Sequence, residues 1–137
     1  MVFKVSGVVF SDLGRASQFM ALDWVQQELR RSLGYNPFPA TLNLRPATEA
    51  DALMWRAAQK ELKGIEMAPA RAAFCSARIF LVDISRPEGE AKPLRGAVLL
   101  PEIADYPGDK IEVVAPERLK DKLGVADGDR LTLEFIH

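Results

Sequence analysis

Two prolines placed two residues apart constrain this chain more than any other local feature. Pro37 and Pro39 each fix their own φ and keep the preceding residue extended, so residues 36–39 should form a stiff connector outside any helix. The residues from Thr41 to Leu44 then alternate polar and apolar, which is the period of a half-buried strand. We therefore expect a strand whose leucines face a core and whose polar residues share the opposite face.

Thr41 and Asn43 place a hydroxyl and an amide oxygen on neighbouring same-side positions of that strand. Neutral oxygen donors of this kind suit Mg²⁺, which keeps several water molecules and takes substrate phosphates as further ligands. An edge strand with two solvated polar residues fits the same pattern. On the motif alone that interpretation is the simpler one, because short motifs often match by chance.

Composition limits the classes of function. The 137 residues fit a single domain, 1–137, and a hydrophobic content of 48% is enough for a sizeable core. The formal net charge of -1 gives no reason to expect nucleic acid or an anionic membrane as a partner. Cys75 is the only cysteine, which excludes an intramolecular disulfide, and its apolar surroundings predict a small buried side chain. His137, the only histidine, is the last residue, which argues against a histidine-based metal site or a Ser-His-Asp triad.

The chain shows neither a signal peptide nor an uninterrupted apolar stretch of membrane-spanning length. We therefore expect a cytoplasmic protein without a membrane partner.

Hydrophobic patterning predicts two or three helices and about six strands. An amphipathic helix is expected over 17–32, with Ser17 as its N-cap and Gly34 just past its end. Another is expected over 47–63, capped by Thr48, and a short one over 116–123. The expected strands are 3–10, 41–44, 77–84, 94–100, 111–115 and 131–136, with a short candidate at 65–67.

The order of these elements favours a mainly β fold with some α-helix. Connections are short, and there is no regular strand–helix–strand alternation, so a small and mostly antiparallel β-barrel with helices packed outside is expected. Residues 11–17 form a small-residue loop after the first strand. Such a loop can wrap a phosphate with its backbone N–H groups, although it is more often a turn, and neither a Walker motif nor G-x-G-x-x-G is present.

Four separated stretches resemble the archaeal-type, CTP-dependent riboflavin kinase family. Residues 34–44 are similar to that family's G-F-x-P-Y-P-G-T-L-N block, and residues 111–120 to its I-E-I-I-A-P-x-x-L-R block. Residues 101–107 resemble its P-E-x-T-x-Y-P loop, and residues 124–129 its closing L-K-D-G-D turn. The resemblance runs through nearly the whole chain in the same order. It implies a riboflavin-kinase-like fold, a six-stranded cradle-loop barrel.

The resemblance also implies roles for particular residues. Thr41 and Asn43 match the family's Mg²⁺ ligands. Glu112 matches a flavin-contacting glutamate that would orient or deprotonate the substrate hydroxyl, and Ala104 stands where the family has a flavin-contacting threonine. The positions that match the nucleotide-binding segments are Asp12, Leu13, Gly14, Arg15, Ala16, Ser17, Glu117, Arg118, Leu119 and Lys120.

The loop after the first strand departs from the family's G-x-G-E-G pattern. Only Gly14 remains of three glycines, Asp12 and Ala16 replace the others, and Arg15 replaces the acidic residue. A carboxylate repels a triphosphate, and a Cβ can block close approach of the backbone. Arg15 could offset part of this by contacting phosphate directly.

The resulting hypothesis is a CTP-dependent riboflavin kinase. It would transfer the γ-phosphoryl group of CTP to the riboflavin 5′-hydroxyl with the help of Mg²⁺, giving FMN and CDP. The altered loop keeps two alternatives open: a non-catalytic flavin- or nucleotide-binding relative, and a kinase of the same fold with a different donor or acceptor. Tyr35, Phe38 or Tyr106 could stack on the flavin ring, although each is more often core or rim. The sequence does not set the oligomeric state.

Overall fold

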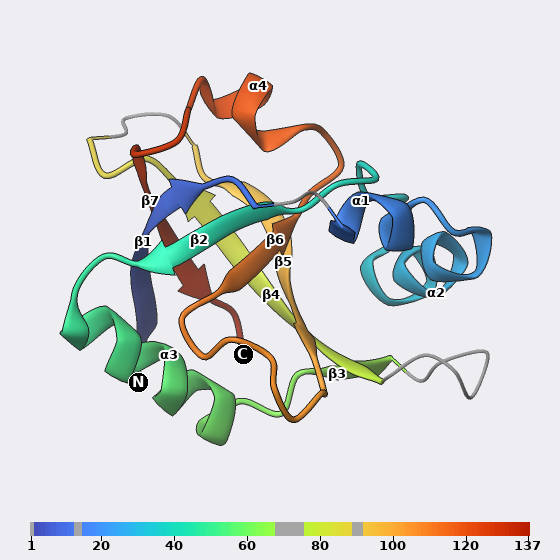
Figure 1. The fold of residues 1–137 in the computed structure, drawn as a ribbon, viewed down its shortest axis with the longest axis horizontal. Coiled ribbons are helices and arrows are strands. Elements are labelled where there is room, and N and C mark those ends of the chain that lie inside the picture. The colour runs from blue at the N-terminus through green and yellow to red at the C-terminus, as the bar shows by residue number, and fades with distance from the viewer. Residues whose placement is uncertain (1, 13–14, 68–75, 89–91) are drawn as a thin grey trace.

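Six strands form a closed antiparallel barrel, and Figure 1 shows this barrel together with the helices around it. The computed structural model describes residues 2–12, 15–67, 76–88 and 92–137. Each strand of the ring pairs with the next in the order β4-β5-β6-β2-β1-β7, and β7 pairs back to β4. The barrel strands are β1 (Phe3–Phe10), β2 (Leu42–Pro46), β4 (Ala77–Ser85), β5 (Leu94–Pro101), β6 (Ile111–Val114) and β7 (Arg130–Phe135).

The short strand β3 (Ile65–Met67) pairs only with β4 and lies outside the ring. The expected six-stranded barrel is thus confirmed, and the short candidate at 65–67 is a seventh strand added to it. Leu13, Gly14 and Cys75 fall outside the described residues, so the predictions made for them stay predictions. In the part of the chain that the structure describes, no helix has the length and apolarity needed to cross a membrane.

The described residues form four helices rather than the two or three expected: α1 (Arg15–Met20), α2 (Asp23–Leu33), α3 (Glu49–Glu61) and α4 (Leu119–Leu123). The helix expected over 17–32 is divided because Leu22 is extended, with φ -65° and ψ 136°. Gln26 Nε2 donates a hydrogen bond to the carbonyl of Met20 at 2.7 Å and so satisfies the end of α1. The prediction of Ser17 as an N-cap was therefore wrong, because Ser17 lies inside α1.

The other helix ends follow ordinary capping rules. Gly34 closes α2 in the left-handed region, at φ 87°, where a glycine carries no steric penalty. The Asp51 N–H donates to Thr48 Oγ1 at 3.1 Å, which confirms Thr48 as the cap of α3. Helix α4 begins at Leu119, later than the predicted start at Pro116.

Two buried clusters hold the helices on the barrel. Trp55 of α3 is 1% exposed and lies with its ring centroid 5.6 Å from Phe135 and 5.9 Å from Phe80. Val25 and Leu29 of α2 belong to the second cluster, which also contains residues of β3, β4, β5 and β6. In Figure 1, α3 lies at the lower left of the barrel and α1 and α2 at its right.

Strand β2 is a central strand, which corrects the interpretation of 41–44 as an edge strand. It pairs with β1 on one side and β6 on the other. Leu42 and Leu44 are buried in the core, as the alternation predicts, yet Asn43 is also only 6% exposed. The proline connector leads into β2 and is tied to the barrel by a hydrogen bond from the Phe38 N–H to the Ala115 carbonyl at 2.8 Å.

Candidate functional site

Asn43 and Glu112 lie directly opposite each other on β2 and β6. They are the buried polar residues among the part of the chain that the structure describes, at 6% and 7% exposure. Thr41 Oγ1 donates a hydrogen bond to Asn43 Oδ1 at 3.3 Å. Burial of an amide and a carboxylate costs free energy unless each is well paired, so their position in a sheet this small indicates a functional site.

Two residues that precede β6, Tyr106 and Lys110, hold the Glu112 carboxylate. Tyr106 Oη donates to Glu112 Oε2 at 2.9 Å, and Lys110 Nζ lies 3.5 Å from Glu112 Oε1. Lys110 Nζ also donates to Asp12 Oδ2 at 2.6 Å. Both oxygens of Glu112 are thus oriented, and each keeps a lone pair for a further partner.

The charges of this cluster shift two pKa values. Burial, the negative charge of Glu112 and the hydrogen bond to it all raise the pKa of Tyr106, and the charge of Asp12 adds to the effect, so the phenol stays a proton donor to Glu112. Burial lowers the pKa of Lys110, but the hydrogen bond to Asp12 and the charges of Glu112 and Asp12 outweigh it, and the pKa is raised overall. Lys110 is therefore a cation at neutral pH.

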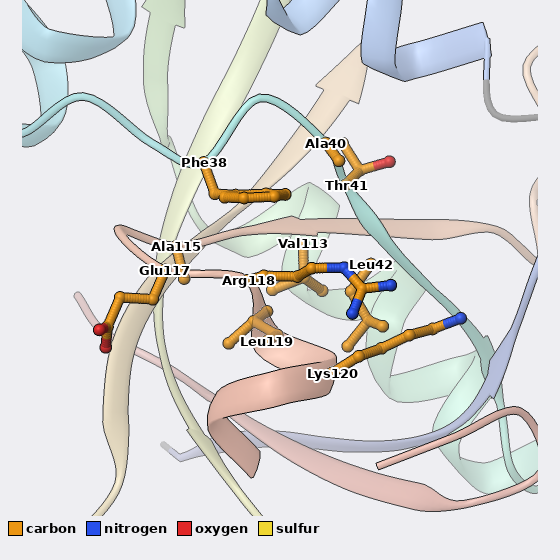
Figure 2. Close-up of a pocket in the computed structure, with 10 residues that line it drawn as sticks. All are labelled: Phe38, Ala40, Thr41, Leu42, Val113, Ala115, Glu117, Arg118, Leu119 and Lys120. Atoms are coloured by element: carbon orange, nitrogen blue, oxygen red, sulfur yellow. The ribbon is translucent and has the colours of Figure 1, made fainter. Parts of the chain in front are cut away.

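A pocket of about 120 Å³ opens between β2, β6 and α4 (Figure 2). Arg118 and Lys120 extend in the same direction along it, whereas Glu117 points the opposite way. This volume is below the ~300 Å³ of a complete ligand pocket, so the pocket fits one part of a nucleotide. The lining residues are Phe38, Ala40, Thr41, Leu42, Val113, Ala115, Glu117, Arg118, Leu119 and Lys120.

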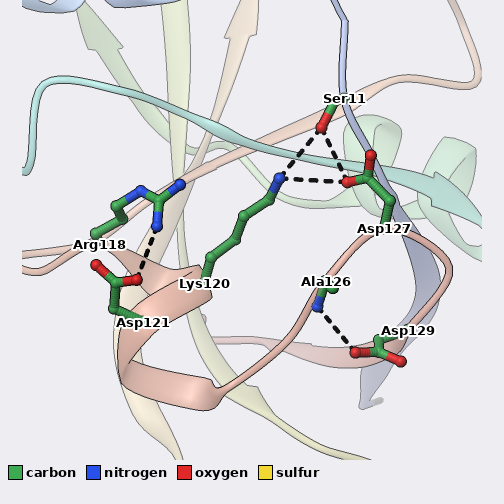
Figure 3. A network of polar contacts seen from close by, with 7 residues as sticks. All are labelled: Ser11, Arg118, Lys120, Asp121, Ala126, Asp127 and Asp129. Atoms are coloured by element: carbon green, nitrogen blue, oxygen red, sulfur yellow. Dashed lines mark hydrogen bonds and ion pairs between the residues drawn. The ribbon is translucent and has the colours of Figure 1, made fainter.

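Lys120 links α4 to the end of β1 and to the turn before β7 (Figure 3). Its Nζ lies 3.1 Å from Ser11 Oγ and 3.2 Å from Asp127 Oδ1. Ser11 Oγ donates to the same Asp127 oxygen at 2.9 Å. The hydrogen bonds from Ser11 and Lys120 lower the pKa of Asp127. Sequence analysis missed Ser11 and Asp127, since the Asp-Gly-Asp segment indicated only a turn.

The other residues predicted to bind the nucleotide do not all lie at the pocket surface. Leu119 is a core residue at 5% exposure, and Glu117 pairs with Lys122 at 3.3 Å. Ser17 is exposed on α1. Arg15 and Ala16 begin the same helix, which shortens the loop expected over 11–17, and their side chains lie outside the described set.

A larger pocket of about 430 Å³ lies beside Tyr106. Trp55, Arg78 and Ile103 line it together with Tyr106, which also donates to Glu112. Tyr106 therefore connects this pocket to the buried carboxylate. Ala104 is exposed in the same loop and contributes only a methyl group. Of the other aromatic candidates, Phe38 lines the pocket at α4, and Tyr35 has a buried hydroxyl without a hydrogen-bond partner.

The donor set on β2 fits a hard divalent cation. Thr41 Oγ1 and Asn43 Oδ1 are 3.3 Å apart, close to the ~2.9 Å between neighbouring oxygens in an octahedral Mg²⁺ sphere with bonds of about 2.0–2.1 Å. Among the described residues there is no group of three or more His, Cys, Asp or Glu suited to a metal ion. A metal at Thr41 and Asn43 would therefore take much of its coordination from water and substrate phosphates.

Comparison with known proteins supports the sequence resemblance. The CTP-dep_RFKase family model, described as domain of unknown function DUF120, matches residues 9–135. A riboflavin kinase of Aeropyrum pernix is 35% identical over 133 residues, covering 95% of this chain and 93% of the relative. A riboflavin kinase of Archaeoglobus fulgidus is 31% identical over 97% of this chain, and one of Pyrobaculum calidifontis is 33% identical over 96% of it. The chain spans only 54% and 59% of these last two relatives.

Proposed function

The chain belongs to the CTP-dependent riboflavin kinase family, and from this membership we propose that it transfers the γ-phosphoryl group of CTP to the 5′-hydroxyl of riboflavin. The observation that carries the proposal is the buried pair of Asn43 and Glu112 on adjacent strands, connected to the pocket at α4 through Thr41, which bonds to Asn43 and lines that pocket. A buried carboxylate, neutral oxygen donors on the neighbouring strand, and the cations Arg118 and Lys120 in the pocket provide the groups that phosphoryl transfer requires.

The pocket at α4 would bind the nucleotide. Leu42, Val113 and Leu119 offer apolar contacts for a base or ribose, and Arg118 and Lys120 offer cations for phosphate. Lys120 is 29% exposed and its ammonium contacts the exposed side chains of Ser11 and Asp127, so it can exchange the Asp127 carboxylate for a phosphate at small cost. Phosphoryl transfer depends chiefly on such positioning and on charge neutralisation.

Thr41 and Asn43 would hold Mg²⁺, which supplies neutralisation of the phosphate charge when bound. Glu112 would accept the proton of the riboflavin 5′-hydroxyl as the oxygen forms its bond to the γ-phosphorus. The bond from that phosphorus to the bridging oxygen breaks, and CDP leaves with the electron pair. Tyr106 orients Glu112 throughout, because its hydroxyl donates to the second carboxylate oxygen.

The 430 Å³ pocket is lined by Tyr106, which donates a hydrogen bond to Glu112, and it would receive the flavin ring. Trp55 and Tyr106 provide aromatic surface there, and Arg78 a polar group at its wall. Ala104 lacks the side-chain hydroxyl that a threonine would provide in this loop, so we expect the flavin to lose one hydrogen bond relative to a threonine at that position.

The test is FMN formation from riboflavin and Mg²⁺ with CTP, ATP, GTP and UTP in turn, read out by chromatography. We expect FMN with CTP and its loss in Asn43→Ala, whereas Asn36→Ala, in the exposed connector, should retain activity. FMN with another nucleotide only would retain the kinase and correct the donor. No FMN with any donor would refute the proposal and favour a binding module or a different acceptor.

A further inference from the structure

Asp12 and Lys110 form an ion pair across the face of β2. Lys110 Nζ is 2.6 Å from Asp12 Oδ2. Asp12 follows the end of β1, and Lys110 precedes β6, whereas β2 lies between these two strands in the sheet. Figure 1 shows β2 in that intermediate position. The pair therefore passes over the strand that carries Asn43.

The same ammonium group reaches a second carboxylate. Lys110 Nζ lies 3.5 Å from Glu112 Oε1, and Glu112 is the partner of Asn43 across β2 and β6. On the other side of β2 the partner of Asn43 is Phe10, two residues before Asp12. One cation thus lies between two carboxylates on the face that holds the buried amide. The side chains of Lys110 and Asp12 are 20% and 30% exposed, so solvent ions can reach them.

We propose that Asp12 is a further ligand of the divalent metal ion at Thr41 and Asn43, and that the Lys110 ammonium takes the place of this cation when the metal is absent. The inference rests on the proposed function, to which the metal site belongs. Thr41 and Asn43 are neutral and provide no charge, whereas Mg²⁺ in phosphate-transfer sites is usually bound through one or two carboxylates together with phosphates. Glu112, the other carboxylate on this face, accepts a hydrogen bond from Tyr106 and is assigned to the substrate hydroxyl, so Asp12 is the carboxylate that can supply this charge to the metal.

The arrangement accounts for a carboxylate next to a phosphate site. Asp12 bound to a divalent cation no longer repels the triphosphate, because the metal neutralises it. Lys110, released from Asp12, then remains beside Glu112 as a cation for the phosphate oxygens. The metal and the Lys110 ammonium compete for the Asp12 carboxylate. Removal of Asp12 should therefore lower metal affinity, and removal of Lys110 should raise it.

The experiment titrates the intact protein with Mn²⁺ alone, without nucleotide or flavin, and measures free Mn²⁺ by electron paramagnetic resonance at neutral pH. We expect Asp12→Asn to weaken Mn²⁺ binding by roughly fivefold or more, because it removes one charged ligand. Lys110→Met should strengthen binding by a similar factor, because it removes the cation that competes for Asp12. In the double variant, Lys110→Met should no longer strengthen binding.

Two matched variants control for general charge effects. Asp109→Asn removes an exposed carboxylate near the start of β6 that pairs with Arg45, and Lys4→Met removes a lysine paired with Glu134 at the far end of β1. Both should bind Mn²⁺ like the wild type. Unchanged affinity in Asp12→Asn, or weaker binding in Lys110→Met, would overturn the inference. FMN formation without these shifts would refute only the inference, and the shifts without FMN formation would refute only the proposed function.

Discussion

The face formed by β2 and β6 and the entrance formed by α4 and the end of β1 are held in different ways. Asn43 and Glu112 are buried, and sheet register places them opposite each other. At the entrance, Lys120 and Asp127 are 29% and 55% exposed and contact each other through their side chains. Backbone pairing fixes the groups that we propose for the reaction, whereas the solvent-exposed side chains at the entrance can exchange one anion for another. In the proposed site, the residues that need exact positions are thus separate from those that would exchange ligands.

The largest expected effect is a loss of folding stability on removal of Trp55 from the barrel core. Trp55→Ala should lower the free energy of unfolding by about 3–5 kcal/mol, because it empties the ring cluster that joins α3 to the barrel. Urea denaturation followed by circular dichroism measures it. Leu53→Ala, at a position of α3 that is 55% exposed, should change the unfolding free energy by less than ~0.5 kcal/mol. Equal losses in both variants would contradict the importance of this cluster.

Glu112→Gln tests whether the face formed by β2 and β6 is where the chemistry takes place. We expect kcat to fall by roughly 10²–10⁴, because the amide cannot accept the hydroxyl proton, while nucleotide affinity changes by less than about twofold. Steady-state kinetics and calorimetric titration of the nucleotide separate the two effects. Glu134→Gln, on the exposed side of β7, is the matched control. If Glu112 had a purely structural role, Glu112→Gln would instead lower the free energy of unfolding and the nucleotide affinity together.

The sequence could predict the features that depend on local pattern, but not those that depend on the order of strands in the barrel. The alternation of 41–44 predicts the strand, and the capping residue Thr48 predicts the start of α3, because both depend on local periodicity and hydrogen bonding. The burial of Asn43 depends on β2 having neighbours on both sides, and local pattern carries no information about strand order. The interruption at Leu22 was missed since its apolar side chain fits the helical stripe.

The long-range contacts of Lys110 and Lys120 were also beyond what the sequence could predict. Lys110 and Asp12 are 98 residues apart, and Lys120 and Ser11 are 109 apart, so only the closed barrel brings them together. The resemblance identified Asp12 as a departure from a glycine, but it did not indicate the lysine that compensates its charge. Long-range charge pairing between exposed loops leaves no periodic signal in a sequence.

Lys120→Met sharpens the comparison at the entrance. Nucleotide affinity should fall roughly tenfold because a phosphate cation is lost, while the free energy of unfolding changes by less than ~1 kcal/mol, as for other half-exposed ion pairs. Calorimetric titration with CTP or CDP measures the affinity. Lys122→Met removes a lysine of the same helix that pairs with Glu117 and does not line the pocket. A similar loss in both variants would indicate a general charge effect.

The smallest effect concerns pH. Hydrogen bonds from Ser11 and Lys120 lower the pKa of Asp127 in the folded protein below the unfolded value of about 3.9. Its contribution to stability is therefore present above about pH 4 and is lost as the pH falls through the lower, folded pKa. Urea midpoints measured from neutral pH down to acid should fall slightly less in Asp127→Asn than in the wild type. Asp105→Asn, in the exposed loop before β6, should follow the wild-type curve.

The most direct test is to locate the metal ion itself. Crystals grown with Mn²⁺ and CDP should give an anomalous difference peak at bonding distance, about 2.0–2.3 Å, from Thr41 Oγ1 and Asn43 Oδ1. Such a peak would place the metal on the face shared by β2 and β6, beside Glu112. A peak elsewhere, with CDP bound away from Arg118 and Lys120, would contradict the assignment of this face as the site of phosphoryl transfer.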